Sequence, residues 1–333
     1  MTSKDNDILF MRRALQLASN GLGLTASNPM VGAVIVGPQG NVLGEGFHRC
    51  YGGPHAEVNA INSVSEHNKH LLAQSTMYVT LEPCSHFGKT PPCANLLVNN
   101  NIKRVFVASS DPFEKVDGRG LDIMMQAGIE VLTGLCETES KCLNARFFTA
   151  HTKKRPFITL KWAQSSDGFM DSDRSAQNKA FVFSTPVSTV AVHKMRSNHM
   201  AIGVGSGTYI ADAPRLDVRH WSGSNPRIVI FDRSGRCSEP TPDIEEVLSK
   251  LYGEGITSIM IEGGPTILNS FINKDLWDFA RVEVSPVRLH DIGRCPAPSL
   301  NRMPFRHMSC DKNDIYFYSN NDLVGDYFVD HSL

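Results

Sequence analysis

A histidine and two cysteines, each directly after a proline, constrain this chain more than any other feature. The residues are His55, Cys84 and Cys93, and Glu57 follows two positions after the histidine. Because proline is favoured at the first position of a helix, we expect helices to begin at these points. A helix start lowers the pKa of a thiol and favours the thiolate that zinc binds. The sequence therefore predicts a fold that gathers these three side chains around one zinc ion (Zn²⁺).

The predicted ligand set indicates a catalytic zinc site. One imidazole and two thiolates leave the fourth tetrahedral position of zinc for water, whereas a structural site is normally closed by a fourth side chain. Residues two apart on a helix are rotated by roughly 200°, so His55 and Glu57 can approach one group only at the helix N-terminus. We predict that Glu57 moves a proton from water to a departing amine. This pattern is typical of nucleobase deaminases, although Cys84 and Cys93 are spaced more widely than the usual pair.

The order of apolar and turn-forming segments predicts two domains. A chain of 333 residues favours two, and helix and strand patterns alternate through both halves, which is typical of layered α/β domains. The polar, basic segment 151–156 is the expected connector, so we place the domains at 1–151 and 152–333. The expected helices are 5–20, 55–64, 94–98, 121–127, 136–150 and 186–196. The expected strands are 31–36, 42–47, 76–81, 104–108, 129–132, 157–162, 201–204, 227–231 and 258–262.

Charge and hydropathy favour small-molecule chemistry. Lys plus Arg (33) nearly balances Asp plus Glu (34), with no basic block for a nucleic acid or a membrane surface. No segment approaches the ~18 apolar residues of a membrane span, and the polar start is unlike a secretory signal. We expect a cytoplasmic protein whose other six cysteines are free thiols.

Four segments of the first half carry a family resemblance. They read "NPMVGAVIV", "GEGFH", "PHAEV" and "TLEPCSHFGKTPPC". They closely resemble the bifunctional deaminase/reductase family of riboflavin biosynthesis, the RibD type. That resemblance implies zinc-dependent deamination of 2,5-diamino-6-(5-phosphoribosylamino)pyrimidin-4-one and then reduction of its ribosyl group to a ribityl chain with NADPH. It also implies a cytidine-deaminase-like α/β domain, a dihydrofolate-reductase-like α/β domain, and a homo-oligomer, either dimer or tetramer.

The resemblance assigns further residues. In the first domain it places four on the substrate side: Asn28, His86, Lys89 and Thr90. In the second, "LKWAQSSDG", "GVGSGTYIADAPRLDVR" and "IEGGPTILNSF" resemble family segments. They imply that Lys161 and Asp212 lie near the ribose carbon that receives hydride. The implied substrate residues are Arg196, Arg219 and Glu262, and the implied NADPH residues are Ala163, Thr208, Asp212, Gly264, Pro265 and Thr266.

Physical chemistry supports part of this second assignment. Glycines after an apolar strand let backbone amides approach a phosphate at a following helix start, as Gly263 and Gly264 would. Arginine binds phosphate bidentately, which suits Arg196 and Arg219. The run Gly203, Gly205 and Gly207 does not fit the Rossmann spacing.

Three alternatives stay open. The chain departs from the family where "AFVFSTP" lacks a tryptophan, and its portion after Val287 is short. It could therefore be a deaminase alone, with a second domain used for packing or dimerisation. It could also be a nucleic-acid-editing deaminase, which its balanced charge opposes. The third alternative is a zinc-stabilised binding module without catalysis.

Overall fold

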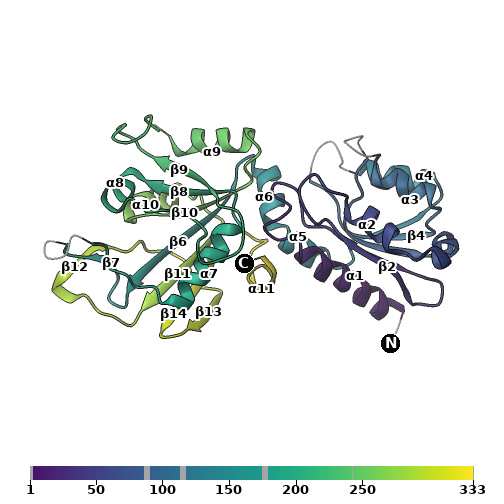
Figure 1. Cartoon of the computed structure of the whole chain (residues 1–333), viewed down its shortest axis with the longest axis horizontal. Coiled ribbons are helices and arrows are strands. Elements are labelled where there is room, and N and C mark those ends of the chain that lie inside the picture. Colours follow the sequence, from purple (N-terminus) through teal and green to yellow (C-terminus); the bar gives the residue numbers. More distant parts are fainter. Residues whose placement is uncertain (1–2, 86–90, 113–117, 175–178, 242, 333) are drawn as a thin grey trace. The chain divides into compact units, whose positions relative to one another are not determined.

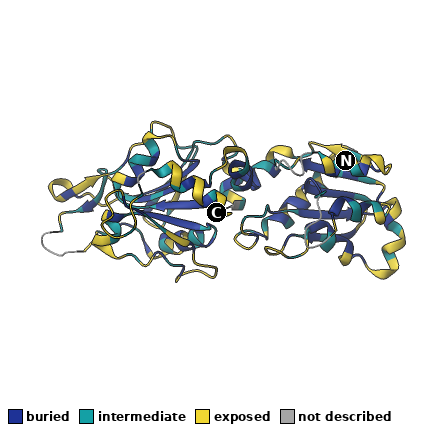
Figure 2. Cartoon of the chain, turned by 90° about the horizontal axis from the view of Figure 1, so that it is seen from above, coloured by how far each residue is buried: buried dark blue, intermediate teal, exposed yellow. Residues whose placement is uncertain are grey.

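The chain divides into two units, residues 1–152 and 153–331, and each is built on its own sheet (Figure 1). The computed structural model describes residues 3–85, 91–112, 118–174, 179–241 and 243–332. Figure 2 colours the strands of both units mostly as buried, with exposed residues on helices and loops. Each unit is therefore a layered α/β body.

The sheet of the first unit has five strands in the order β2-β1-β3-β4-β5. Strand β1 runs antiparallel to both neighbours, while β3, β4 and β5 run parallel. The strands are β1 (Gly32–Val36), β2 (Val42–Phe47), β3 (Thr76–Leu81), β4 (Arg104–Ser109) and β5 (Glu130–Thr133). All five expected strands of this half are confirmed to within a residue or two at their ends.

Helices cover both faces of this sheet because its central strands are apolar on both sides. Ala33 and Ile35 pack in one core cluster with α2, α3 and α4, while Val34 and Val36 pack in another with α1. The backbones approach so closely that a Cβ on Gly32 would lie 2.0 Å from the backbone oxygen of Ala14. The helices are α1 (Ser3–Ser19), α2 (Ala56–Ser63), η1 (Glu66–Gln74), α3 (Cys93–Asn99), α4 (Arg119–Gln126), α5 (Glu137–Leu143) and α6 (Ala145–Lys153).

The prediction of one helix over 136–150 is wrong. The structure has α5 and α6, which are separated by Asn144. The backbone of Asn144 leaves the helical region, with φ −100° and ψ 25°. Its side chain accepts a hydrogen bond from Met30 N at 2.8 Å and donates one to Met30 O at 2.9 Å. Because α6 continues to Lys153, the expected connector 151–156 is also partly helical.

The second unit contains a seven-stranded sheet in the order β13-β14-β11-β6-β10-β8-β9. Strands β11, β6, β10, β8 and β9 run parallel, and β14 and β13 are added antiparallel. The expected strands of this half are confirmed as β6 (Phe157–Ser165), β8 (Ala201–Gly205), β9 (Arg227–Phe231) and β10 (Ser258–Glu262). The unpredicted strands are β7 (Phe169–Ser172), β11 (Phe279–Ser285), β12 (Gly293–Pro296), β13 (Arg306–Cys310) and β14 (Asn313–Ser319).

Parallel strands need crossover connections, and helices supply them here. Their apolar sides pack against the sheet in one core cluster that includes Leu248, Leu268 and Phe271. The helices are α7 (Pro186–Ser197), α8 (Ser206–Asp212), α9 (Ile244–Gly253), α10 (Pro265–Asn273), η2 (His290–Ile292) and α11 (Asp326–Ser332). Because β6, β10, β8 and β9 are parallel neighbours, their carboxyl ends line one edge of the sheet.

A buried carboxylate fixes the start of the second unit. Asp278 is fully buried and accepts two hydrogen bonds from the Arg155 guanidinium, at 2.6 and 3.0 Å. It also accepts one from Lys153 Nζ at 3.0 Å and one from Ile158 N at 2.9 Å. Burial raises the pKa of Asp278, but the bond and charge of Arg155 outweigh burial and hold that pKa below its ordinary value.

We expect Asp278→Asn to lower the free energy of unfolding by about 3–5 kcal/mol, because it leaves Arg155 without its buried partner. A carboxyl group with a lowered pKa stabilises the fold above its ordinary pKa and loses this effect as the pH falls. The substitution should therefore also flatten the acid side of the stability profile, measured by urea denaturation. The matched control is Asp275→Asn, since Asp275 is bonded at an exposed site to Asn320. An equal loss in both variants would contradict the prediction.

Candidate functional site

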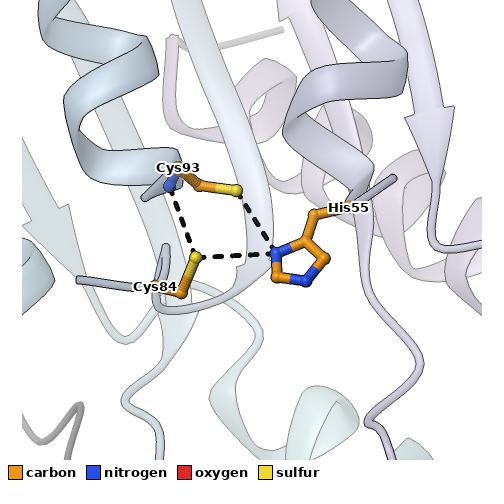
Figure 3. Close-up of side chains that lie close together, drawn as sticks. All are labelled: His55, Cys84 and Cys93. Carbon is orange, nitrogen blue, oxygen red and sulfur yellow. Dashed lines mark hydrogen bonds between the residues drawn. The ribbon is translucent and has the colours of Figure 1, made fainter. Parts of the chain in front are cut away.

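Three side chains of the first unit converge on one point (Figure 3). His55 is the N-cap of α2, Cys84 follows the end of β3, and Cys93 is the first residue of α3. His55 Nδ1 lies 3.3 Å from Cys93 Sγ and 3.6 Å from Cys84 Sγ. All three candidate ligand atoms lie within 4.8 Å of one another. The predicted convergence of the three side chains is thus confirmed, but the helix start expected at Cys84 is wrong, because Cys84 lies in a segment without helix or strand.

Helices α2 and α3 begin after their prolines and not at them. Helix α2 begins at Ala56 with His55 as its N-cap, so Pro54 lies one residue before the cap. Helix α3 begins at Cys93, so Pro92 is its N-cap. We had predicted that each proline would occupy the first helical position, and neither does. Both precede a helix start, and the backbone at each N-cap, His55 and Pro92, is extended (ψ 167° and 141°).

The distances in this cluster fit a zinc ion. Tetrahedral zinc with bonds of about 2.3 Å to sulfur and about 2.0–2.1 Å to nitrogen separates the two ligand atoms by about 3.5 Å. The measured nitrogen–sulfur distances of 3.3 and 3.6 Å lie on either side of this value. Within the described part of the chain, the cluster has only these three members. The cluster therefore has the ligand number of a catalytic zinc site.

The environment of the two thiols favours a thiolate. Cys93 N donates to Cys84 Sγ at 3.3 Å. A hydrogen bond from the Cys93 thiol lowers the pKa of Cys84, burial opposes this effect, and the hydrogen bond with His55 lowers the pKa further. The same bond, together with burial, raises the pKa of Cys93. Cys84 therefore favours the thiolate form, and both cysteines would hold a zinc ion as thiolates.

Glu57 lies next to the cluster in the first turn of α2 and is 3% exposed. Burial raises the pKa of Glu57 to about 7, and the charge of His55 partly opposes this rise. A carboxyl group with a pKa near neutrality can both accept and return a proton. Glu57 is not part of the ligand cluster, so it is available for proton transfer.

Asn28 reaches the cluster through a histidine that the sequence analysis missed. Asn28 Nδ2 lies 3.2 Å from His48 Nε2, and His48 Nδ1 lies 3.1 Å from the backbone oxygen of Pro54. Since that oxygen can only accept, Nδ1 carries the proton and Nε2 accepts from Asn28. The His48 and His55 rings meet edge to face at 5.5 Å. His86, Lys89 and Thr90 lie outside the described residues.

A second cluster lies in the second unit, where the strand register brings Lys161 of β6 beside Glu262 of β10. Arg196 of α7 binds Glu262 with two hydrogen bonds, at 2.8 and 2.9 Å, and Lys161 Nζ lies 4.0 Å from the same carboxylate. Burial lowers the pKa of Lys161, with the charge of Glu262 opposing it. The structure thus brings together three of the residues that the resemblance assigned.

The remaining predicted residues of this unit are distributed around that cluster. Arg219 binds Asp217 Oδ1 at 2.6 Å, and the backbone oxygen of Asp217 accepts from Arg196 at 3.0 Å. Asp212 ends α8 and pairs with Arg174 at 2.5 Å, whereas the ion pair of Lys161 is with Glu262. Ala163 lies in β6, opposite Glu283 of β11.

A pocket of about 290 Å³ opens at the carboxyl ends of β8, β9 and β10. It is lined by the predicted cofactor residues Thr208, Gly264 and Thr266, and Gly264 N donates to Thr208 Oγ1 at 3.1 Å. Pro265 is the first residue of α10, as its place after the glycines predicts. Arg233 and Arg236 also line the pocket. The sequence analysis missed both, because arginines in a loop carry no spacing signal.

Comparison with known sequences assigns each unit to a family model. Residues 4–109 match the cytidine and deoxycytidylate deaminase zinc-binding region, and residues 156–299 match the RibD C-terminal domain. The riboflavin biosynthesis protein RibD of Aquifex aeolicus is 35% identical over 320 residues, which cover 85% of this chain and 88% of that protein. The chain belongs to the RibD family. RibD of Escherichia coli is 33% identical, with 89% of this chain and 93% of that protein covered.

Solved RibD structures extend the match to the fold. Acinetobacter baumannii RibD superposes with a TM-score of 0.86 at 29% identity, covering 95% of this chain and 99% of that one. A Thermotoga maritima protein, named a diaminohydroxyphosphoribosylaminopyrimidine deaminase/5-amino-6-(5-phosphoribosylamino)uracil reductase, gives 0.83 at 31% identity, with the same coverage.

The comparisons confirm the expected fold class and the expected kind of enzyme. The chain is an α/β protein with an N-terminal cytidine-deaminase domain and a C-terminal RibD reductase domain of the dihydrofolate-reductase type. It is a bifunctional RibD deaminase/reductase of riboflavin biosynthesis with a His/Cys/Cys cluster for zinc. Among the helices of the described residues, none is long and apolar enough to cross a membrane.

Proposed function

We propose that the chain deaminates 2,5-diamino-6-(5-phosphoribosylamino)pyrimidin-4-one and then reduces the ribosyl group of the product to a ribityl chain with NADPH. The observation that carries this proposal is the cluster of His55, Cys84 and Cys93 beside the buried Glu57. The relative from Thermotoga maritima is named for the same two reactions, which supports the pairing of both activities in one chain.

In the deaminase unit, His55, Cys84 and Cys93 would hold zinc, which when bound lowers the pKa of water and so supplies a nucleophile at neutral pH. Glu57 takes the proton released from that water and returns it to the departing amine, which leaves as ammonia. We assign Asn28 to the pyrimidine on the resemblance, and His48 accepts from its amide nitrogen and so fixes which way the amide faces. We assign His86, Lys89 and Thr90 to the substrate on the resemblance alone.

In the reductase unit, Arg196, Arg219 and Glu262 hold the substrate, and the two guanidinium groups bind its phosphate. Lys161 and Asp212 lie toward the ribose carbon that is reduced, Asp212 on the resemblance alone. Burial lowers the pKa of Lys161, so its proton is easier to release than that of an exposed lysine. The two hydrogen bonds between Arg196 and Glu262 restrict both side chains and so hold the cluster in one geometry.

NADPH fits the edge of the sheet on which these residues lie, and when bound it supplies the hydride. Lys161 is on β6, and the pocket extends past β10 and β8 to β9, three strand spacings or about 14 Å away. An extended dinucleotide can span this distance. We propose that its reactive ring lies toward Lys161 and Ala163, that Thr208 and Gly264 to Thr266 hold its diphosphate, and that Arg233 and Arg236 hold its third phosphate.

One assay tests both activities separately. Purified protein with the pyrimidine substrate should release ammonia, and NADPH oxidation should follow. Ammonia release without NADPH oxidation or NADPH binding would favour the alternative of a deaminase with a packing domain. Binding of single-stranded RNA at low salt would favour an editing deaminase. Zinc binding without either reaction would favour the binding module.

We expect Arg233→Ala to weaken NADPH binding by about tenfold and to leave NADH binding unchanged, because only NADPH carries the 2′-phosphate. The measurement is the KM for each dinucleotide in the reductase assay. Arg227→Ala is the matched control, since Arg227 lies on β9 and pairs with Glu254 at an exposed site. A loss of equal size for both dinucleotides would contradict the assignment of Arg233.

We also propose that the enzyme works in the cytoplasm as a homo-oligomer, a dimer or a tetramer, as its family resemblance implies. Light scattering of the purified chain would report its mass in solution. A monomer at enzyme concentrations that support both activities would contradict the second part of this proposal.

A further inference from the structure

Two buried histidines at the end of α7 differ in their bonding. His199 is 4% exposed, and both ring nitrogens have partners: Met195 O at 2.7 Å and Thr159 Oγ1 at 2.8 Å. His193 is 2% exposed, and its Nδ1 is buried with no hydrogen-bond partner among the described residues. Buried polar atoms nearly always have a partner, and leaving one unpaired costs stability. His199 is structural, whereas His193 is placed like a residue that awaits a ligand.

The groups around His193 are mostly cationic. Burial lowers its pKa, and the charges of Arg196, Arg219 and His220 lower it further, while Asp217 opposes them. The His220 ring meets the His193 ring edge to face at 4.7 Å. Asp217 is already paired with Arg215 and Arg219. An anion is therefore the ligand that this surrounding favours.

A second carboxylate that interacts with the charge of His193, Glu262, also has its hydrogen-bond partners already. Glu262 feels the charge of His193, but both of its oxygens accept from Arg196. Both carboxylates near His193 are thus already paired with arginines. The arginines keep donor capacity beyond their present bonds, since a guanidinium has five N–H groups.

The direction of α7 places His193 toward the reaction edge of the sheet. Ser188, in the first turn of α7, donates to Glu283 at 2.6 Å. Glu283 lies on β11 two residues beyond Arg281, which is level with Lys161 in the strand register. The start of α7 therefore lies at the carboxyl ends of the parallel strands. His193 precedes Arg196 by one helical turn on the same face, which brings it closer than Arg196 to that edge.

We propose that His193 binds the phosphate of the ribosyl phosphate in the reductase unit, together with Arg196 and Arg219. This inference rests on the proposed reduction of a phosphorylated ribose. A ring N–H of His193 donates to a phosphate oxygen beside the two guanidinium groups, and bonds of this kind between charged groups are among the strongest in proteins. Phosphate binding supplies the partner that the buried ring lacks.

The test uses the full-length protein and ribose 5-phosphate as the probe, with its dissociation constant measured by calorimetry. We expect His193→Gln and His193→Phe to weaken binding by at least about tenfold, the effect of losing one hydrogen bond between charged groups. Ammonia release should be unchanged, since the deaminase site is in the other unit. Lys194→Gln is the matched control, because Lys194 neighbours His193 on α7 but lies over Trp221.

The pH dependence separates binding from a structural role. Protonation of His193 favours the anion, so the wild type should lose affinity relative to His193→Gln as the pH rises from about 6 to about 8. The ionisation of ribose 5-phosphate itself is common to both proteins and cancels in this ratio. Parallel pH profiles, unchanged affinity in both His193 variants, or no binding by the wild type would each overturn the inference. Ribose 5-phosphate binding without NADPH oxidation would instead count against the proposed reduction.

Discussion

Glu57→Gln should reduce ammonia release by about 10²–10⁴-fold while zinc stays bound, because glutamine fills the same buried space but cannot carry the proton. Ammonia release and zinc content, measured on the same preparation, check this result. Glu66→Gln is the matched control, since Glu66 is an exposed residue of η1 that pairs with Lys69. Retained deamination in Glu57→Gln would remove the proposed proton transfer, and loss of zinc would make Glu57 a ligand.

Cys93→Ser should remove both zinc and deamination but leave NADPH oxidation intact when the deaminated intermediate is supplied. Changing a residue that only supports a ligand typically costs 10–100-fold in metal affinity, so losing a ligand should cost at least about 100-fold. Metal analysis after dialysis and the two separate assays check this result.

A second cysteine provides the control for this substitution. Cys142 is buried in the same unit but has no part in the cluster, so Cys142→Ser should retain zinc and both activities. A parallel loss of NADPH oxidation in Cys93→Ser would show that the two units do not act independently. Full zinc occupancy in Cys93→Ser would contradict the three-ligand site.

The zinc cluster could be predicted from the sequence because its members carry local signals. Cys84 and Cys93 are rare residue types beside prolines, and His55 and Glu57 are two residues apart. The strands of the first unit could also be predicted, since their apolar runs are short and bounded by turns. Strand β11 was missed because Arg281 and Glu283, which pair with each other along the strand, interrupt its apolar pattern with charges.

Residues whose role depends on distant partners could not be predicted. His48 lies 20 residues from Asn28 in the chain, and the hydrogen bond between them is visible only in the fold. Arg233 belongs to the pocket because parallel strands place it at the same edge as Thr208. The family resemblance named Thr208 but carried no motif at Arg233.

Gly263 is required for packing and not for the phosphate contact that the sequence suggested. We expected Gly263 to let backbone amides approach a phosphate. A Cβ at this position would lie 2.6 Å from Ile267 Cγ2, so Gly263 is required by packing between β10 and α10. Gly264 has more room, since its Cβ would meet Thr208 Oγ1 at 3.4 Å, and it is the glycine that lines the pocket.

The break between α5 and α6 links a helix late in the first unit to the segment that carries Asn28. Asn144 satisfies both backbone groups of Met30, which lies two residues after Asn28. A continuous helix would turn that amide elsewhere and leave the Met30 backbone without these bonds. With the role proposed for Asn28, the specificity of the deaminase depends in part on Asn144, which lies 116 positions further along the chain. Alanine at that position would favour a continuous helix but would lose both bonds to Met30.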